Sequence, residues 1–322
     1  MLQALIWSAG GLGLLIIGAE TLVRGGSALA ARLRISPLVV GLTIVAVGTS
    51  APELAIGVEA AVQGNGSLAV GNIAGTNCVN ILLILGLSAA MRPLPLRLQT
   101  LRLELPVIVG ASVLKAVMVA DGVLSRLDGA VLVSLGLLFT IGIVRASRDE
   151  SFTVRKEFAA EYGGRSKDRH GMLREVTQLV GGIAVVVLGA DWLVDGAVDL
   201  ARLWGVSDAF IGLTIVAIGT SAPELVTTVV STMRDQRDIA IGNLIGSSAY
   251  NILIILGVTS LVPAGGIGVA EALIWVDVPV MVAVALACVP VFLTGRIVSR
   301  AEGVGFVLAY LAYLSFLLAE RT

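Results

Sequence analysis

The chain has 322 residues, of which 57% are hydrophobic and 14% are charged, and its formal net charge is −1. A soluble domain carries roughly 25% charged residues, so this composition excludes an ordinary water-soluble protein. This net charge argues neither for nor against a nucleic-acid partner, but the sequence contains no basic patch with interleaved aromatic residues. Apolar runs of about 20 residues, long enough to cross the ~30 Å hydrocarbon core, predict an all-α polytopic protein of the lipid bilayer.

Ten membrane-spanning helices are expected, separated by clusters of Gly, Pro, Ser and charged residues. The N-terminus lacks the basic region and cleavage site of a signal peptide, so the first segment is expected to be a retained helix. Cys78 and Cys288 both lie in apolar segments and indicate neither a disulfide framework nor a metal motif. In chain order the predicted spans are 3–31, 37–62, 68–91, 101–120, 126–146, 172–202, 208–232, 238–262, 271–293 and 302–319.

The sequence contains an internal repeat with an offset of 171 residues. Residues 41–54 read GLTIVAVGTSAPEL and residues 212–225 read GLTIVAIGTSAPEL, so these segments differ only at Val47 and Ile218. Because an odd number of spans precedes the second copy, that copy enters the membrane from the opposite side. We therefore predict two inverted-topology five-helix repeats, at 1–146 and 172–322, joined by a linker at 147–171.

The distribution of positive charge predicts the orientation. Seventeen of the 22 Lys and Arg residues fall on the side reached after the first helix, and three fall on the other side. Positive residues concentrate in cytoplasmic loops, so both termini are expected outside and the 147–171 linker in the cytoplasm. His170 is expected to be a solvated residue of this linker. The short loops and bare termini favour a prokaryotic inner membrane.

The repeated motif predicts a broken helix near the middle of the membrane. Pro52 has no N–H group, so the carbonyl of Gly48 loses its helical partner, and Gly48 itself loosens the backbone. Thr49, Ser50 and Glu53 lie within one helical turn, so their oxygens can face one cavity. The second copy repeats this arrangement with Gly219, Thr220, Ser221, Pro223 and Glu224.

The span after each broken helix adds further oxygen ligands. Thr76 and Asn80 are four residues apart on one helix face, and Ser247 and Asn251 repeat this spacing. Inverted symmetry is expected to bring all four segments together at the bilayer midplane. The combined set consists of carboxylates, hydroxyls, amides and backbone carbonyls, which suit Ca²⁺ or Na⁺ and do not suit zinc or copper.

Two carboxylates at the centre of the bilayer constrain the chemistry. Ionised Glu53 and Glu224 balance one divalent cation or two monovalent ones, whereas one bare charge there costs about 2.5–3.5 kcal/mol on insertion scales. The site should therefore be occupied or protonated whenever the protein moves, which is how an antiporter behaves. A structural alternative pairs one glutamate with Arg24, the only basic residue expected deep within a span.

Two further pairs of acids match across the repeat. Glu20 corresponds to Asp191 near the centre of a long helix, and Glu104 corresponds approximately to Asp277, each two residues before a proline. The second pair marks either helix ends at the membrane interface or an ion entry path. The sequence leaves the role of all four acids open.

These motifs resemble the alpha repeats of the calcium/cation antiporter superfamily, and within it the sodium/calcium exchangers. The resemblance rests on the doubled GTSAPEL and on GNIAGTNCVN at 71–80 and GNLIGSSAYN at 242–251. It implies two inverted five-helix halves in which the first helix of each half slides against the rest. The ligands it implies are Thr49, Ser50, Glu53, Thr76, Asn80, Thr220, Ser221, Glu224, Ser247 and Asn251, with the backbone carbonyls of Ala46 and Ala217.

Two departures from the family pattern bear on the transported ions. Asn251 replaces the Asp that the potassium-dependent branch uses for potassium, which suggests potassium independence. Thr76 keeps the hydroxyl of the usual Ser and adds a methyl group. Asn251 leaves the driving ion open between sodium and protons, and the hydroxyl-rich broken helices favour sodium.

The predicted function is secondary active antiport of Ca²⁺ against Na⁺ by alternating access, with no cofactor and no enzymatic activity. Antiport of Ca²⁺ against protons through the same glutamates is the nearest alternative. A cation channel needs weak binding at several sites, which a dense cluster of ligands at one depth disfavours. An intramembrane hydrolase needs a water-activating acid pair but not the surrounding hydroxyls and amides. The oligomeric state is left open.

Overall fold

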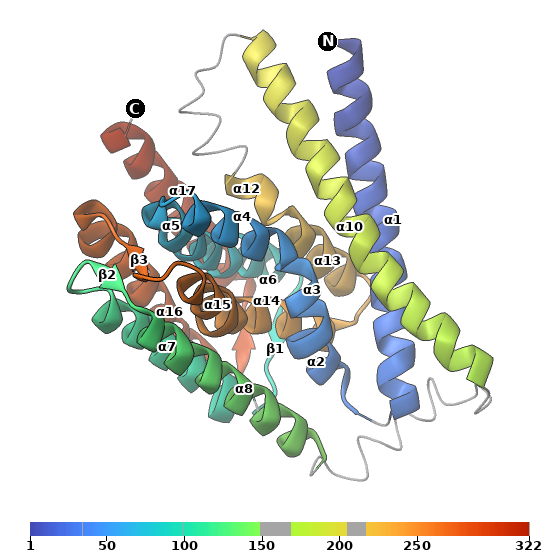
Figure 1. The fold of residues 1–322 in the computed structure, drawn as a ribbon. Helices are drawn as coiled ribbons and strands as arrows, with labels where there is room; N and C mark the ends of the chain where they lie inside the picture. The colour runs from blue at the N-terminus through green and yellow to red at the C-terminus, as the bar shows by residue number, and fades with distance from the viewer. Residues whose placement is uncertain (34, 99, 149–168, 205–216, 322) are drawn as a thin grey trace.

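The computed structural model describes residues 1–33, 35–98, 100–148, 169–204 and 217–321, and these are almost entirely helical (Figure 1). In the first half the helices are α1 (Leu2–Leu33), α2 (Pro37–Val40), α3 (Ala46–Thr49), α4 (Ala51–Val62), α5 (Gly66–Cys78), α6 (Gly86–Met91), α7 (Leu105–Met118) and α8 (Arg126–Arg148), with π-helical segments η1 (Gly41–Val45), η2 (Val79–Leu85) and η3 (Thr100–Glu104). The later helices are α10 (Arg169–Leu203), α12 (Ala217–Thr220), α13 (Ala222–Met233), α14 (Arg237–Tyr250), α15 (Gly257–Leu261), α16 (Val278–Leu293) and α17 (Arg300–Arg321), with π-helical η5 (Asn251–Leu256) and η6 (Leu273–Asp277).

Helical segments lie at every predicted span that the structure describes. Seven of the described helical segments are long and apolar enough to cross a membrane, and the bent pair 37–49 and 51–62 makes an eighth candidate. The chain is therefore a mostly helical, polytopic membrane protein. Residues 208–216 of the predicted seventh span, and residues 149–168 of the predicted linker, lie outside the described residues. His170 falls at the start of α10, and its side chain is not among those described.

α1 and α10 form a long antiparallel pair along one edge of the molecule (Figure 1). Glycines recur every seven residues on both helices and let the two backbones touch. A Cβ at Gly18 would lie 2.7 Å from the backbone nitrogen of Val186, and one at Gly182 would lie 2.5 Å from that of Leu22. Because lipid removes most of the hydrophobic drive between helices, such close packing of small residues is a main source of association. The glycines of this seam are Gly11, Gly18, Gly25, Gly182, Gly189 and Gly196.

The centre of the protein is formed by two continuous spans, 66–91 and 237–261, each of which follows one of the broken helices. Their most apolar stretches are 78% and 94% buried, whereas that of α17 is 17% buried, so α17 faces lipid and the two central spans do not. Each central span contains a π-helical segment, η2 or η5, that begins beside one of the predicted amide ligands. π-helical turns inside α-helices are rare and occur frequently at functional sites.

Four two-residue strands were not expected in an all-α protein. β1 (Leu94–Pro95) pairs with β4 (Ile297–Val298), and β2 (Val123–Leu124) pairs with β3 (Ile267–Gly268), both antiparallel. Each pair joins a connecting segment of the first half of the chain to one of the second half. Pairing satisfies backbone groups that would otherwise be left without partners between the helices, and hydrophobic periodicity gives no signal for strands this short.

Candidate functional site

The predicted helix breaks are present in both copies of the motif. α3 ends at Thr49, Ser50 adopts φ −84° and ψ 13°, and α4 begins at Ala51 with a bend of 43°. In the second copy Ser221 adopts φ −88° and ψ 7° between α12 and α13. Proline lies in the first turn of both α4 and α13, where its missing N–H group costs no helical hydrogen bond. The break therefore turns the hydroxyl and carboxyl groups of the motif inward.

Glu53 and Glu224, in the first turns of α4 and α13, are fully buried. Their carboxyl groups are close enough to repel each other when both are ionised. Glu224 Oε1 accepts hydrogen bonds from Ser50 Oγ at 3.1 Å and from Ser247 Oγ at 3.4 Å. Neither oxygen of Glu53, nor Oε2 of Glu224, has a hydrogen-bond partner within the described part of the chain. Buried acids left in this condition are costly, which marks them as candidates for ligand binding.

A second group of contacts joins the first broken helix to α14. The carbonyl of Ala46 accepts from Ser247 Oγ and from Thr49 Oγ1, each at 3.4 Å. Thr49 Oγ1 is also 3.1 Å from Asn243 Oδ1, and Asn243 Nδ2 donates to Thr228 Oγ1 at 3.2 Å. Asn243 was not predicted as a site residue. Its polar side chain lies in an apolar helix, where it needs a polar partner, and this could have marked Asn243 as a site residue.

The two predicted amide ligands differ in their surroundings. Asn251 Nδ2 donates to Asn77 Oδ1 at 3.3 Å, and Asn77 Nδ2 donates to the carbonyl of Ser248 at 3.0 Å. Asn80 is also fully buried, and neither atom of its amide has a hydrogen-bond partner among the described residues. Asn77 is a second residue that the sequence did not single out, although it lies between the two predicted ligands of its own helix.

The structure thus brings Ala46, Thr49, Ser50, Glu224 and Ser247 into one hydrogen-bonded group, with Glu53 as a close electrostatic neighbour. Thr76 and Ser221 are buried at their predicted helical positions but are not part of this group. Thr220 is half-buried at the end of α12. Ala217 is the first residue of α12, and its side chain is not among those described.

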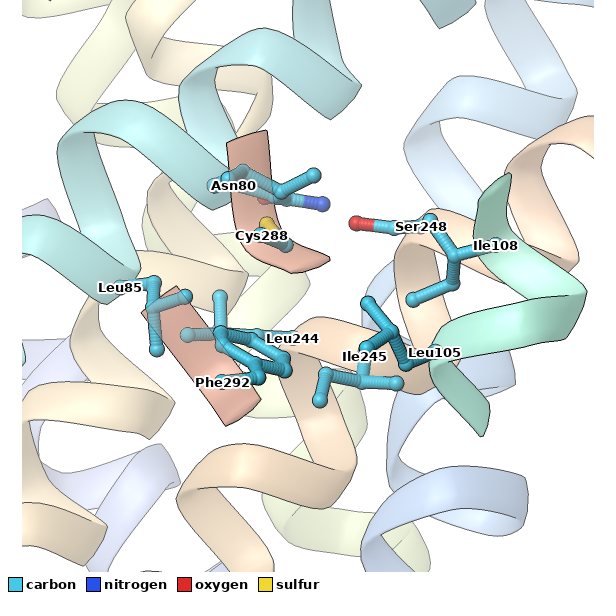
Figure 2. Close-up of a pocket in the computed structure, with 10 residues that line it drawn as sticks. Asn80, Leu85, Leu105, Ile108, Leu244, Ile245, Ser248, Cys288 and Phe292 are labelled. Carbon is cyan, nitrogen blue, oxygen red and sulfur yellow. The ribbon is translucent and has the colours of Figure 1, made fainter. Parts of the chain in front are cut away.

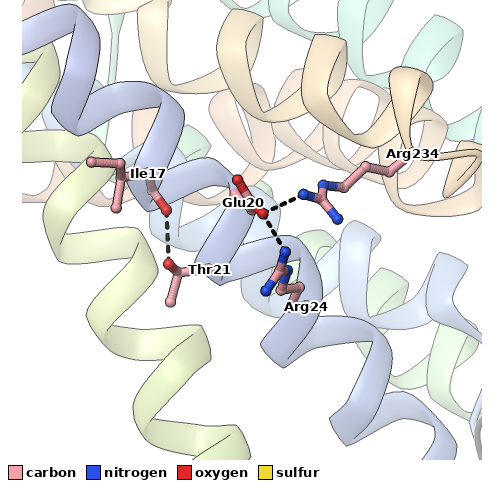
Figure 3. Close-up of polar contacts among 5 residues, drawn as sticks. All are labelled: Ile17, Glu20, Thr21, Arg24 and Arg234. Atoms are coloured by element: carbon pink, nitrogen blue, oxygen red, sulfur yellow. Dashed lines mark hydrogen bonds and ion pairs between the residues drawn. The ribbon is translucent and has the colours of Figure 1, made fainter.

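The structural alternative based on Arg24 is wrong. Arg24 is an exposed residue of α1, and both it and Arg234 form ion pairs with Glu20 (Figure 3). The available signal was the spacing of Glu20 and Arg24, which are four residues apart and therefore neighbours on one face of α1. Among the described residues, the buried basic residue is instead Lys115 of α7, whose Nζ donates to the carbonyl of Val70 at 3.3 Å and lies 3.7 Å from Met281 Sδ.

The remaining acids lie where helical segments meet. Glu104 is the last residue of η3, immediately before α7, and Asp277 is the last residue of η6, immediately before α16. Asp277 Oδ1 accepts a hydrogen bond from Tyr313 at 2.9 Å. Both acids are buried, at the start of helices that contain Pro106 and Pro279 in the first turn. Each acid lies inside a continuous helical span, 100–118 or 273–293, and not at its end.

A small cavity lies beside Asn80. Asn80 and Ser248 provide its polar groups, and the amide of Asn80 and the hydroxyl of Ser248 face each other across it (Figure 2). The other lining residues are Ile81, Leu85, Leu105, Ile108, Leu244, Ile245, Cys288 and Phe292.

Chemically, the site offers hard oxygen donors that the protein itself does not satisfy. They are both carboxylate oxygens of Glu53, Oε2 of Glu224, the hydroxyl of Ser221 and the amide oxygens of Asn80 and Asn251, none of which has a partner within the described residues. Oxygen donors of this kind fit Ca²⁺, which accepts 6–8 of them with flexible geometry.

Comparison with known proteins identifies the family of this chain. The sequence profile of the sodium/calcium exchanger protein family matches residues 3–144 and 175–319. The sodium/calcium exchanger MaX1 of Methanosarcina acetivorans is 32% identical over 335 residues, covering 94% of this chain and 95% of that protein. The inner membrane protein YrbG of Escherichia coli is 39% identical over 263 residues, covering 80% of this chain and 79% of that protein.

The fold is also that of a solved exchanger. The structure of the sodium/calcium exchanger from Methanococcus jannaschii matches with a TM-score of 0.82 and 28% identity, covering 98% of both chains. Its coverage shows that all the described elements belong to one shared architecture. The chain therefore belongs to the sodium/calcium exchanger family, whose members are membrane antiporters for cations and Ca²⁺.

Proposed function

We propose that this protein exchanges Na⁺ for Ca²⁺ across a prokaryotic inner membrane by alternating access. The proposal includes ten membrane-spanning helices in two inverted five-helix repeats, at 1–146 and 172–322, with both termini outside and the 147–171 linker in the cytoplasm. The repeated sequence and the bias of positive charge support this topology. The family membership and the sodium/calcium exchanger relatives support the choice of ions.

The observation that carries the proposal is the pair of fully buried glutamates with oxygens that lack hydrogen-bond partners in the described residues. Ca²⁺ would bind between Glu53 and Glu224 and neutralise both charges. Two Na⁺ ions would balance the same pair, so the two cargoes compete for one set of carboxylates. Ligands from Thr49, Ser50, Thr76, Asn80, Thr220, Ser221, Ser247, Asn251 and the carbonyls of Ala46 and Ala217 would complete the site.

Coupling follows from the cost of leaving this pair bare. Without a cation, two ionised carboxylates would face each other in a medium of low dielectric constant, which raises the free energy of any state that must close around them. Closure is then favourable when Ca²⁺ or Na⁺ is bound, and unfavourable when the site is empty. A carrier of this kind moves Ca²⁺ in one direction only when Na⁺ returns in the other.

The test is ⁴⁵Ca²⁺ uptake into proteoliposomes with one gradient imposed at a time. An outward Na⁺ gradient at equal pH should drive uptake, and a pH gradient in Na⁺-free buffer should not. Uptake that follows the pH gradient and ignores Na⁺ would instead establish exchange of Ca²⁺ for protons.

Matched substitutions test the two glutamates. Glu53→Gln and Glu224→Gln should each abolish exchange, because one remaining carboxylate cannot balance a divalent cation. Glu59→Gln is the control, because Glu59 lies on the same helix α4 as Glu53 but is exposed and accepts a hydrogen bond from Gln63 at 3.1 Å. Exchange that survives in either buried variant would remove the shared carboxylate pair from the mechanism.

A further inference from the structure

The two predicted amide ligands are held in different ways. Asn251 donates its amide hydrogen to Asn77 Oδ1, and Asn77 is itself fixed because its Nδ2 donates to the carbonyl of Ser248. All three residues are at least 98% buried. This relay of two hydrogen bonds, from Asn251 to Asn77 and from Asn77 to Ser248, fixes the orientation of the Asn251 amide. The NH₂ group of Asn251 donates to Asn77, and its Oδ1 is left without a partner among the described residues.

The repeat identifies the counterpart of Asn77. With the offset of 171 residues, Asn80 corresponds to Asn251, and Ser248 corresponds to Asn77. Ser248 therefore occupies the position beside Asn80 that Asn77 occupies beside Asn251. The serine side chain is shorter than that of asparagine, so it does not reach across to the amide.

The space left by this shorter side chain is the cavity of Figure 2. Asn80 and Ser248 line it from opposite sides, and their polar atoms have no hydrogen-bond partner within the part of the chain that is described. A water molecule in the cavity would not touch these polar atoms, because the accessible lining is almost entirely apolar. The Asn80 amide therefore has no support like that of Asn251 among the described residues.

We propose that Asn77 is a positioning residue that orients the amide ligand Asn251 by a direct hydrogen bond. This inference rests on the proposed function, because it assigns Asn80 and Asn251 to cation binding. Residues that hydrogen-bond to the direct ligands of a metal set the orientation of those ligands. Loss of such a residue costs about 10- to 100-fold in metal affinity.

The relay also selects the residue at position 251. An Asp there would place a carboxylate oxygen against Asn77 Oδ1, and two acceptors repel each other. If Asn77 rotated to present its NH₂ group, its Oδ1 would face the carbonyl of Ser248 instead. The amide at position 251 is therefore the form that this network accommodates, and it keeps the charge of the site at that of its two glutamates.

A double-mutant cycle tests Asn77. Asn77→Ala should raise the KM for Ca²⁺ about 10- to 100-fold with little change in maximal rate, because the misoriented amide weakens binding. In the Asn251→Ala background the same substitution should have no further effect, since the amide that it orients is gone. Independent effects that multiply in the double variant would overturn the proposal.

Two further variants keep this test informative. Cys78→Ala is the matched control, because it alters the adjacent buried position of α5, and Cys78 makes no described hydrogen bond to the site. Asn77→Ser is the fallback if Asn77→Ala does not fold, and it should give a KM between those of the wild type and Asn77→Ala. An Asn77→Ser variant with the wild-type KM would count against the inference.

Exchange by the wild-type protein distinguishes a failure of the proposed function from a failure of the positioning role. If the wild type does not exchange ⁴⁵Ca²⁺, the proposed function fails, and the positioning role that rests on it fails as well. If the wild type exchanges Ca²⁺ and the effects of Asn77→Ala and Asn251→Ala multiply, the positioning role alone fails.

Discussion

At the scale of single residues, Glu53 shows the conflict between stability and function. It is fully buried beside a second acid, and its two oxygens have no hydrogen-bond partner in the described residues. Replacing buried charges with neutral groups of similar size is often neutral or stabilising. Sites of this kind persist because function requires them, and stability is lost in exchange.

Glu53→Gln should therefore separate the two properties. In cation-free buffer the variant should unfold at a temperature equal to or above that of the wild type, because the repulsion with Glu224 is removed. Ca²⁺ at 100 times its Kd should stabilise the wild type by about 2.7 kcal/mol, and should not stabilise the variant. Thermal unfolding in detergent, with and without Ca²⁺, measures both effects.

The control for this measurement is Glu59→Gln, which should respond to Ca²⁺ as the wild type does. Equal stabilisation of Glu53→Gln and the wild type by Ca²⁺ would contradict a role for Glu53 in binding.

Lowering the pH should weaken the binding of Ca²⁺ at the two buried glutamates. Protons compete with cations for Glu53 and Glu224, because protonation removes the negative charge that Ca²⁺ needs. The KM for Ca²⁺ should therefore rise as the pH falls, and it should do so without loss of folded protein. A KM measured by ⁴⁵Ca²⁺ exchange that stays constant in acid would show that these carboxyl groups do not bind Ca²⁺.

At the scale of helices, the seam between α1 and α10 depends on glycine. A Cβ at Gly18 would meet the backbone of Val186, whereas Gly13 on the same helix has open space around it. Gly18→Leu should force the helices apart and destabilise the protein by several kcal/mol, because overpacking cannot be relieved against a backbone. Gly13→Leu should be tolerated. Thermal unfolding of both variants checks this difference, and equal losses would contradict it.

The ion pair between Glu20 and Arg234 should matter less than this seam. Both side chains are more than one-third exposed, and exposed ion pairs contribute about 0–1 kcal/mol. Glu20→Gln should therefore lower stability by less than Gly18→Leu does, and high salt should abolish the difference between Glu20→Gln and the wild type. A large, salt-insensitive loss in Glu20→Gln would reveal a stronger role for this contact between α1 and α13.

At the scale of the whole molecule, the sequence predicted the features that depend on neighbouring residues or on the internal repeat. Apolar length located the helical segments, and Pro52 and Pro223 located the breaks that the structure contains at Ser50 and Ser221. Hydrophobic periodicity could not reveal contacts between distant segments. The pairing of Arg234 with Glu20, the burial of Lys115 and the relay through Asn77 all depend on how helices meet in space.

The predicted orientation can be tested on the whole molecule. Protease added to inside-out vesicles should cut within the 147–171 linker, and protease added to right-side-out cells should not. Cleavage from the outside would reverse the assignment of both termini and of the linker.

The two short strand pairs constrain how such a protein can move. β1 with β4 and β2 with β3 fasten the first half of the chain to the second at two separate places. The two halves cannot separate by a hinge motion without breaking these backbone hydrogen bonds. We propose that the working cycle preserves both strand pairs and moves the edge pair α1 and α10, packed together through its glycines, along the remaining helices.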